Sequence, residues 1–243
     1  MSDDPTTGHS RYPRLRRVGV IAVLAFFVLV VFIVFTRGDE QVAEHSQANP
    51  TLPPTGTPAL FAPAGGPPGV IRVASSDSSL APDVVVTVVE DYLCENCAEF
   101  AQQYRSVLRE VASVPGVVLE FVPIAGSGTE DARRVANASL CVAADTLENW
   151  VAYRTALFAA APLSASHDGL TDDRLVEIAH TTGASHAAAE CILGQSFIDD
   201  VDANTLDWVN EQDLPLVLLD GSPYPLQTPD VFAEDVRDAV RDS

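Results

Sequence analysis

The stretch Val84–Cys97, VVVTVVEDYLCENC, constrains the fold of this chain more than any other part of the sequence. Its first six residues are all β-branched and show no polar alternation, which is the pattern of a central strand buried on both faces. Cys94 and Cys97 follow in C-x-x-C spacing, and apolar residues then recur at helical spacing. These apolar residues are Phe100, Tyr104, Val107, Leu108 and Val111. The stretch therefore predicts a buried strand that leads into a helix with two cysteines at its N-terminus.

The two cysteines at this predicted helix start indicate thiol–disulfide chemistry. The helix dipole and the unpaired backbone N–H groups at a helix N-terminus stabilise a thiolate on the first cysteine. A zinc site would need a second close pair of ligands, whereas Cys141 and Cys191 stand singly further along the chain. A purely structural bridge between Cys94 and Cys97 would close a loop too short to remove much chain entropy. We therefore interpret these two residues as a redox pair, with the zinc site and the structural bridge as the alternatives.

The charge of the chain excludes one class of partner. All 14 basic residues are arginine, and the formal net charge is −20. Residues 38–243 hold 9 arginines against 32 acidic residues, so this part of the chain repels nucleic acid and anionic lipid surfaces. The sequence also contains no glycine-rich phosphate loop, Ser/His/Asp set or carboxylate metal cluster. We expect a protein that binds no nucleic acid, no metal and no cofactor.

An apolar run near the N-terminus predicts a membrane anchor at residues 18–36, after a polar and basic tail at residues 1–17. As a helix, the run would span about 27 Å, close to the thickness of the hydrocarbon layer. Four arginines precede it and only Arg37 follows closely, so the positive-inside rule places the N-terminus in the cytoplasm. A cleavable signal peptide is the alternative, although no A-x-A-like site follows directly. In either case the remaining chain is extracytoplasmic, where disulfides persist, and the anchored form is a single-pass protein of the cell membrane.

Residues 37–69 form the predicted linker and residues 70–243 the folded domain. The linker is rich in proline and glycine and has few large apolar residues, so it cannot bury a core and should be semi-extended. In the domain, β-branched and apolar runs bounded by turn residues predict the strands. These strands are Val70–Val73, Val84–Val89, Val117–Val122 and Leu214–Asp220.

Helical patterns fill the rest of the domain. One helix is predicted from about Glu95 to Val114, and an alanine-rich helical block occupies about residues 127–212. A last amphipathic helix is predicted to start with Asp230 as its N-cap. Its inward side chains are expected to be Val231, Phe232, Val236 and Val240. This order of elements predicts an α/β fold, with one sheet and an inserted α-helical subdomain.

With these features the chain resembles the DsbA family of the thioredoxin superfamily, in its membrane-anchored actinobacterial form. That family has a thioredoxin-like fold interrupted by a helical subdomain, a C-x-x-C after a central strand, and a cis-proline strand after the insert. The resemblance makes Cys94 the exposed nucleophile and Cys97 the buried resolving cysteine. It also makes Leu214 and Pro215 the cis-proline segment that faces the cysteines and helps to hold an extended substrate. An ordinary trans proline at a strand entry is the alternative for Pro215.

The resemblance further implies a structural disulfide between Cys141 and Cys191, as in some actinobacterial relatives. A bridge that closes so long a loop would stabilise the fold by about 4 kcal/mol on the chain-entropy model. Two buried free thiols are the alternative.

The sequence departs from strong oxidases of the family at several positions. Glu95 and Asn96 stand between the cysteines in place of proline and histidine, and Glu95 repels a thiolate that a histidine cation would stabilise. Val88 occupies the position six residues before Cys94, where many thioredoxin-like proteins carry a buried acid. No arginine or histidine lies within seven residues of Cys94. Glu90 is interpreted as a solvated charge at the strand end, and the alternative is that Glu90 takes the place of the missing buried acid. We therefore expect a lower reduction potential than that of a strong oxidase.

The resemblance implies an enzyme, a protein disulfide oxidoreductase that forms disulfides in exported cysteine-containing proteins. A DsbB-like or vitamin-K-epoxide-reductase-like membrane protein would then be the redox partner that reoxidises the dithiol. One alternative is a membrane-tethered thiol reductase or disulfide isomerase on the same fold. Another is a DsbA-like binding module whose cysteines have lost catalysis.

Overall fold

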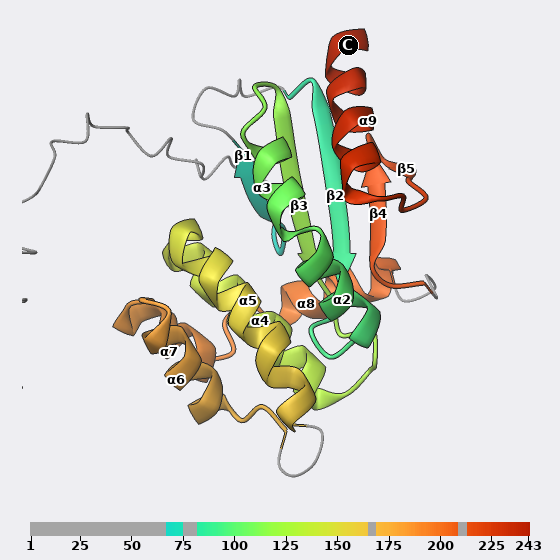
Figure 1. The fold of residues 1–243 in the computed structure, drawn as a ribbon. Coiled ribbons are helices and arrows are strands. Elements are labelled where there is room, and N and C mark those ends of the chain that lie inside the picture. The colour runs from blue at the N-terminus through green and yellow to red at the C-terminus, as the bar shows by residue number, and fades with distance from the viewer. Residues whose placement is uncertain (1–66, 75–81, 165–168, 209–212) are drawn as a thin grey trace, which may run out of the picture. The chain divides into compact units, whose positions relative to one another are not determined.

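The computed structural model describes residues 67–74, 82–164, 169–208 and 213–243 (Figure 1). All of these residues belong to one compact unit. The predicted tail, the membrane anchor and most of the linker lie outside the described residues. Within the described ranges, no helix combines the length and the apolar character that a membrane crossing requires.

A five-stranded sheet forms the centre of the described unit. Its strands are β1 Ile71–Ala74, β2 Val84–Glu90, β3 Val117–Pro123, β4 Leu216–Leu219 and β5 Ser222–Pro223. They lie in the order β1-β3-β2-β4-β5. β2 runs parallel to β3 and antiparallel to β4, while β1 pairs antiparallel with β3 and β5 with β4. The sheet is therefore mixed, with β2 in the middle.

β2 takes the central place because its side chains are apolar on both faces. Val84, Val86 and Val88 on one face and Val89 on the other are buried, whereas Val85 and Thr87 on the second face are half-buried. Such β-branched side chains pack well on a pleated surface, and a run of them is stable only where both faces are covered. The structure thus confirms an α/β fold with a buried central strand. It moves the predicted strand ends by at most two residues.

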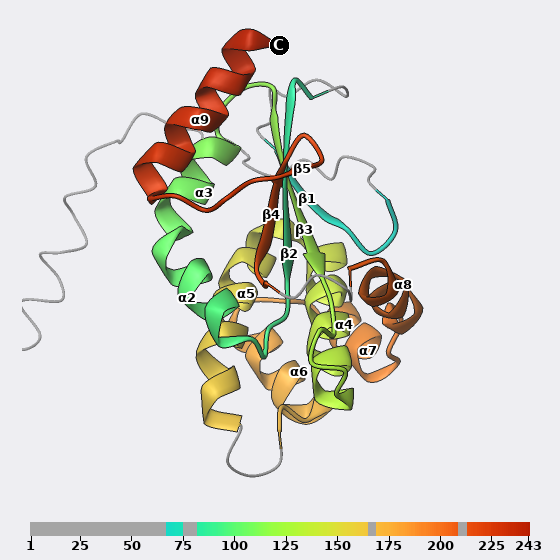
Figure 2. The same cartoon turned by 90° about the vertical axis from the view of Figure 1, so that its right-hand side faces the viewer.

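Three helices cover one face of the sheet, as the edge-on view in Figure 2 shows. They are α2 Glu95–Gln103, α3 Arg105–Ala112 and α9 Pro229–Asp242. Their buried side chains form one apolar cluster with the inward side chains of the sheet, among them Val86, Val111 and Phe232. The cluster fixes the position of α2, the helix that follows the central strand.

The sequence predicts one continuous helix from Glu95 to Val114, and this prediction is wrong at Tyr104. The chain turns there, with φ −93° and ψ 1°, and α2 ends where α3 begins. The Tyr104 ring is stacked on Phe100 with ring centroids 4.6 Å apart and meets the edge of Phe232 in α9 at 5.8 Å. Its hydroxyl donates to the carbonyl of Gln227. These contacts to α9 and to the loop before it hold the Tyr104 side chain at a bend that helical spacing alone does not reveal.

α9 begins at a different N-cap from the one predicted. Thr228, not Asp230, occupies the cap position, because the proline after Thr228 suits the first turn of a helix, where its missing N–H is not needed. Phe232 and Val236 are buried as predicted. Val231 is 41% exposed, so its predicted inward position is wrong. The apolar stripe follows i, i+4 spacing from Phe232, and Val231 lies outside that stripe.

Five helices between β3 and β4 form the helical insert. They are α4 Glu130–Asp145, α5 Leu147–Ser164, α6 Asp172–Thr181, α7 His186–Leu193 and α8 Ile198–Trp208. α4 is the centre of the insert and contacts each of the other four helices. Figure 1 shows that α4 and α5 lie at the end of the sheet where β2 leads into α2. All five helices fall within residues 127–212, the range predicted for the insert.

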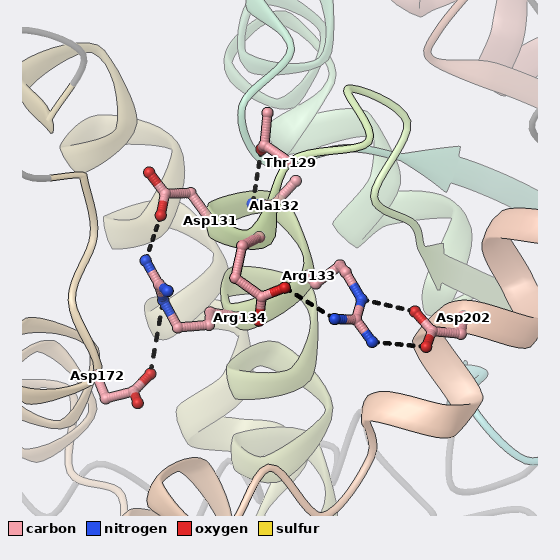
Figure 3. Close-up of polar contacts among 8 residues, drawn as sticks. Thr129, Asp131, Ala132, Arg133, Arg134, Asp172 and Asp202 are labelled. Carbon is pink, nitrogen blue, oxygen red and sulfur yellow. Dashed lines mark hydrogen bonds and ion pairs between the residues drawn. The ribbon is translucent and has the colours of Figure 1, made fainter.

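Polar contacts at the start of α4 fix its neighbours (Figure 3). The Thr129 side chain accepts a hydrogen bond from a backbone N–H of the first turn and caps the helix. Arg133 donates two hydrogen bonds to Asp202 of α8, at 2.8 and 2.6 Å. Arg134 reaches Asp172 at the start of α6. Such half-exposed ion pairs add little stability each, and here they link the start of α4 to α8 and α6.

A disulfide joins α4 to α7. It links Cys141 to Cys191, with Cα atoms 5.6 Å apart, across a sequence separation of 50 residues. The cysteines left free in the described residues are Cys94 and Cys97. The disulfide therefore lies within the helical insert, whereas the free dithiol lies at the end of the sheet.

Replacing Cys141 and Cys191 by alanine should lower the free energy of unfolding by about 4 kcal/mol, because the bridge restricts the unfolded chain over a long loop. Urea unfolding of the variant and its parent measures the loss. Both proteins should carry Cys94→Ala and Cys97→Ala, so that the redox state of the dithiol does not contribute. A loss below about 1 kcal/mol would contradict a stabilising role for the bridge.

Candidate active site

β2 and α2 bring the two free cysteines to one end of the sheet. Cys94 is the N-cap of α2, and Cys97 lies in its first turn. Asp91 shapes the turn between strand and helix, because its carboxylate accepts hydrogen bonds from the N–H groups of Leu93 and Ser127, at 2.8 and 2.9 Å. Among the described residues, no side chain caps the N-terminus of α2. Its first N–H groups therefore remain available to a negative charge at the Cys94 sulfur.

The two thiols differ in their access to solvent. Cys94 is half-buried, whereas the Cys97 side chain is 0% exposed. Burial raises the pKa of Cys97 well above its usual range, and the neighbouring Cys94 and Glu90 raise it further. A hydrogen bond from the Asp91 backbone lowers the pKa of Cys97 only in part. Cys97 therefore keeps its proton at neutral pH, and Cys94 is the thiol that a substrate can reach.

The segment before β4 lies directly opposite the dithiol. The Leu214–Pro215 peptide bond is cis. The Cys94 sulfur lies 3.8 Å from the carbonyl oxygen of Leu214, a residue 120 positions further along the chain. The sheet makes this approach possible because β4 pairs with β2, the strand that carries the dithiol at its end.

A groove of about 400 Å³ lies beside the dithiol, between α2, the Leu214–Pro215 segment and the loop before α9. Apolar side chains such as Phe100 and Leu226 line it together with two acidic residues, Glu99 and Asp213. Leu214 and Pro215 also line the groove. The groove can therefore take an extended polypeptide segment whose cysteine lies against Cys94.

The charge beneath the dithiol differs from the sequence-based prediction. Glu90 is not a solvated strand-end charge, because its side chain is 0% exposed. Arg154 of α5 donates hydrogen bonds to both of its carboxylate oxygens, at 2.7 and 2.5 Å. The guanidinium also lies against the rings of Phe121 and Phe158, at 4.9 and 5.1 Å from their centroids. Such pairing is required because an unpaired charge in the interior is strongly destabilising.

The sequence interpretation misses Arg154 because it considers only the arginines close to Cys94 along the chain. In the structure, Arg154 interacts electrostatically with Cys97 although the two residues belong to different parts of the fold. A signal is nevertheless present in the sequence. Arg154 is a lone cation in an otherwise apolar stretch of α5, and Glu90 ends an apolar strand. Charged residues at such positions are rarely buried without a partner.

Val88 occupies the position at which many thioredoxin-like proteins carry a buried acid. In this chain Glu90 supplies a buried carboxylate close to Cys97. Its negative charge contributes to the raised pKa of Cys97, and the positive charge of Arg154 lies beside it. Because Arg154 comes from α5, the helical insert takes part in setting the electrostatic surroundings of the dithiol. The insert is therefore part of the active-site structure and not only a cover.

A second buried network joins the insert to the turn after β2. The Tyr92 hydroxyl lies 2.6 Å from the Ser139 hydroxyl oxygen of α4, and the Trp150 indole N–H of α5 donates to the same oxygen at 2.9 Å. Burial, together with the charge of Glu90, raises the pKa of Tyr92, so its hydroxyl stays protonated. The network holds α4 and α5 against the end of the central strand.

The other predicted site residues divide between the mouth of the site and the insert. Glu95 and Asn96 are exposed at the mouth, and Asn96 lines the groove. Cys141 and Cys191 lie in α4 and α7 of the insert and are joined to each other by the disulfide. In the part of the chain that the structure describes, no group of three or more His, Cys, Asp or Glu residues could hold a metal ion.

Comparison with known proteins gives matches among solved structures. No protein-family model matches the chain, and no curated protein sequence matches it significantly. Reduced DsbA from Mycobacterium tuberculosis matches with a TM-score of 0.65 and 25% identity, over 71% of this chain and 92% of that chain. Reduced DsbG from the same organism, a disulfide bond oxidoreductase, matches with a TM-score of 0.65 and 26% identity, over 73% and 89%. MdbA, a thiol-disulfide oxidoreductase from Corynebacterium diphtheriae, shares the fold at a TM-score of 0.59 and 18% identity, over 69% and 89%.

These matches extend over almost the whole length of each relative, so the likeness includes the helical insert as well as the sheet. The site adds an independent observation, since a dithiol at a helix N-terminus faces a cis-proline segment. The chain is therefore a DsbA-like oxidoreductase of the thioredoxin superfamily.

Proposed function

We propose that the chain forms disulfide bonds in exported proteins by dithiol–disulfide exchange through Cys94 and Cys97. The observation that carries this proposal is the arrangement of three groups. Cys94 is accessible at a helix N-terminus, Cys97 is buried behind it, and the cis Leu214–Pro215 peptide lies against Cys94. A substrate thiolate can attack the accessible Cys94 sulfur. The buried Cys97 is then the leaving thiol and is not itself open to attack by the substrate.

In the proposed reaction the oxidant is a disulfide between Cys94 and Cys97. A substrate thiolate attacks the Cys94 sulfur, which forms a mixed disulfide and releases Cys97. Cys97 takes up a proton because its pKa is raised by burial. A second substrate thiolate then attacks the substrate sulfur of the mixed disulfide and releases Cys94 as a thiolate. The substrate has lost two electrons and gained a disulfide, and the reduced dithiol holds those electrons.

The groove beside the dithiol would hold the substrate. An extended substrate segment would lie against the backbone at Leu214 and Pro215, with its side chains in the space next to Phe100 and Leu226. Glu99 and Asp213 would favour substrate segments that carry basic residues near the reacting cysteine. Leu214 and Pro215 are thus proposed as substrate-binding residues, and Glu95 and Asn96 as residues that tune the potential of the dithiol.

The proposed setting is the outer side of the cell membrane. Residues 18–36 would form a single-pass anchor with residues 1–17 in the cytoplasm, and the linker at residues 37–69 would hold the domain clear of the bilayer. The apolar run and the arginines before it support this arrangement. A DsbB-like or vitamin-K-epoxide-reductase-like partner in the same membrane would accept the two electrons and restore the disulfide.

A thiol reductase or disulfide isomerase is the second candidate function. Glu95 and Glu99 are exposed on α2 beside the dithiol and place negative charge there, and Glu90 is buried beneath it. Negative charge disfavours the thiolates of the reduced form, which stabilises the disulfide and lowers the reduction potential. The direction of electron flow therefore depends on how far Arg154 and the helix dipole offset these carboxylates.

A Cys97→Ser variant tests the proposed function, because it removes the resolving cysteine and should accumulate mixed disulfides between Cys94 and exported proteins. The full-length variant should be expressed in a bacterium that exports it, alkylated in acid, and separated on non-reducing gels. A Cys94→Ser/Cys97→Ser variant is the matched control and should form none. A Cys97→Ser protein that traps no exported protein would contradict the proposal and favour a binding module.

A further inference from the structure

Arg105 and Arg109 differ from the other arginines that the structure describes. Every other arginine in the described ranges forms an ion pair with a carboxylate. Arg105 and Arg109 have no ion pair among the described residues, and both are exposed. They stand one turn apart on α3, so their guanidinium groups can reach the same anion. Two adjacent unpaired arginines are unexpected in a chain with 34 acidic residues.

Both arginines line one pocket, which has a volume of about 70 Å³ and lies between α2, α3, the sheet and α5. Its walls are mainly apolar, with Leu108, Phe121 and Trp150 among them. A single ordered water needs only about 10–15 Å³ of such volume and also needs polar partners. The pocket therefore has room for an apolar group of several heavy atoms, next to two guanidinium groups.

This pocket is separate from the groove beside the dithiol, because the two share no lining residue. It lies where the helical insert meets the sheet, and ligand sites are common at such junctions. Arg154 also lines it, but its guanidinium is already bound to Glu90. The cations left for a ligand are Arg105 and Arg109.

We propose that this pocket binds a small organic carboxylate, whose apolar body fills the cavity and whose carboxylate pairs with Arg105 and Arg109. The net charge of −20 favours a small monoanion over an acidic protein segment, because long-range repulsion grows with the charge of the ligand. The local attraction of two arginines acts within a Debye length of about 8 Å, which is enough for one carboxylate. The site goes beyond the exchange reaction and does not depend on it.

The test is titration of the folded protein with 4-methylpentanoate, followed by calorimetry and by tryptophan fluorescence, since Trp150 forms part of the wall. Saturable binding is expected, weakened about tenfold or more in an Arg105→Gln/Arg109→Gln variant that loses the charge-assisted pairs. An Arg174→Gln variant is the matched control, because Arg174 is exposed but lies on α6, away from the pocket. The control should bind as the parent does.

Three outcomes would overturn the proposal. The first is a lack of saturable binding up to about 20 mM ligand, because a small ligand of this kind should bind with a dissociation constant of about 1 mM. The second is equal binding of 4-methylpentanamide or of the double variant, because either would show that the arginines do not take part. The third is tighter binding, lost in the double variant, of the peptide acetyl-Asp-Leu-Asp-amide, which would make the pocket a docking site for acidic proteins.

Discussion

Replacing Arg154 by methionine will destabilise the protein by about 3–5 kcal/mol, because it leaves the carboxylate of Glu90 buried without its partner. Methionine retains much of the side-chain length, so the loss comes mainly from the missing charge. The double variant Glu90→Gln/Arg154→Met removes both charges and should recover most of the lost stability. Urea unfolding of the parent, the two single variants and the double variant, all with the dithiol oxidised, measures the coupling.

Arg133→Met is the matched control, because Arg133 also donates two hydrogen bonds to a carboxylate but is half-exposed. This control should lose no more than about 1 kcal/mol. If Arg154→Met loses no more than Arg133→Met, or if the double variant is as unstable as the single one, the buried pair does not have the role assigned to it here.

The reduced protein will lose stability as the pH rises above about 8.5, where an ordinary cysteine releases its proton in the unfolded chain. Burial raises the pKa of Cys97 in the folded state, so the native protein keeps a proton that the unfolded chain has lost. The free energy of unfolding should therefore fall by about 1.4 kcal/mol per pH unit. The stabilisation is complete below about pH 8.5 and declines as the pH rises further towards the raised pKa of Cys97 in the folded state.

A reduced Cys97→Ala variant provides the comparison for this pH dependence. It keeps the Cys94 thiol and the buried tyrosines Tyr92 and Tyr153, whose pKa values are also raised by burial. These groups affect both proteins alike, so the difference in slope reports Cys97. Denaturant unfolding at several pH values under a strong reductant measures it. Parallel stability curves for the two proteins would show that Cys97 does not hold its proton in the folded state.

The parts of the fold that the sequence predicts are those set by local patterns. Six consecutive β-branched residues predict a central strand such as β2, because in a sheet it is mainly the central strands that are covered on both faces. The C-x-x-C motif follows directly and is positioned by the same strand and helix. The break at Tyr104 is not local, since Tyr104 contacts α9 and the loop before it, far along the chain.

The electrostatics of the site could not be predicted from neighbours in the sequence. Glu90 and Arg154 are 64 residues apart, and their contact exists only because the insert packs α5 against the end of β2. The apolar strand before Glu90 indicates that a buried Glu90 would need a cation, but it does not identify which arginine supplies it. The contact of Cys94 with Leu214 is likewise a product of strand pairing, here between β2 and β4.

The reduction potential of the Cys94–Cys97 pair tests the central claim most directly. The folded protein should be equilibrated in glutathione redox buffers, with the fraction of disulfide measured by alkylation. The acidic surroundings offset by Arg154 predict a potential above the roughly −270 mV of thioredoxin but below the roughly −120 mV of a strong oxidase. A value at or below that of thioredoxin would contradict disulfide formation as the physiological direction and make a reductase the better account.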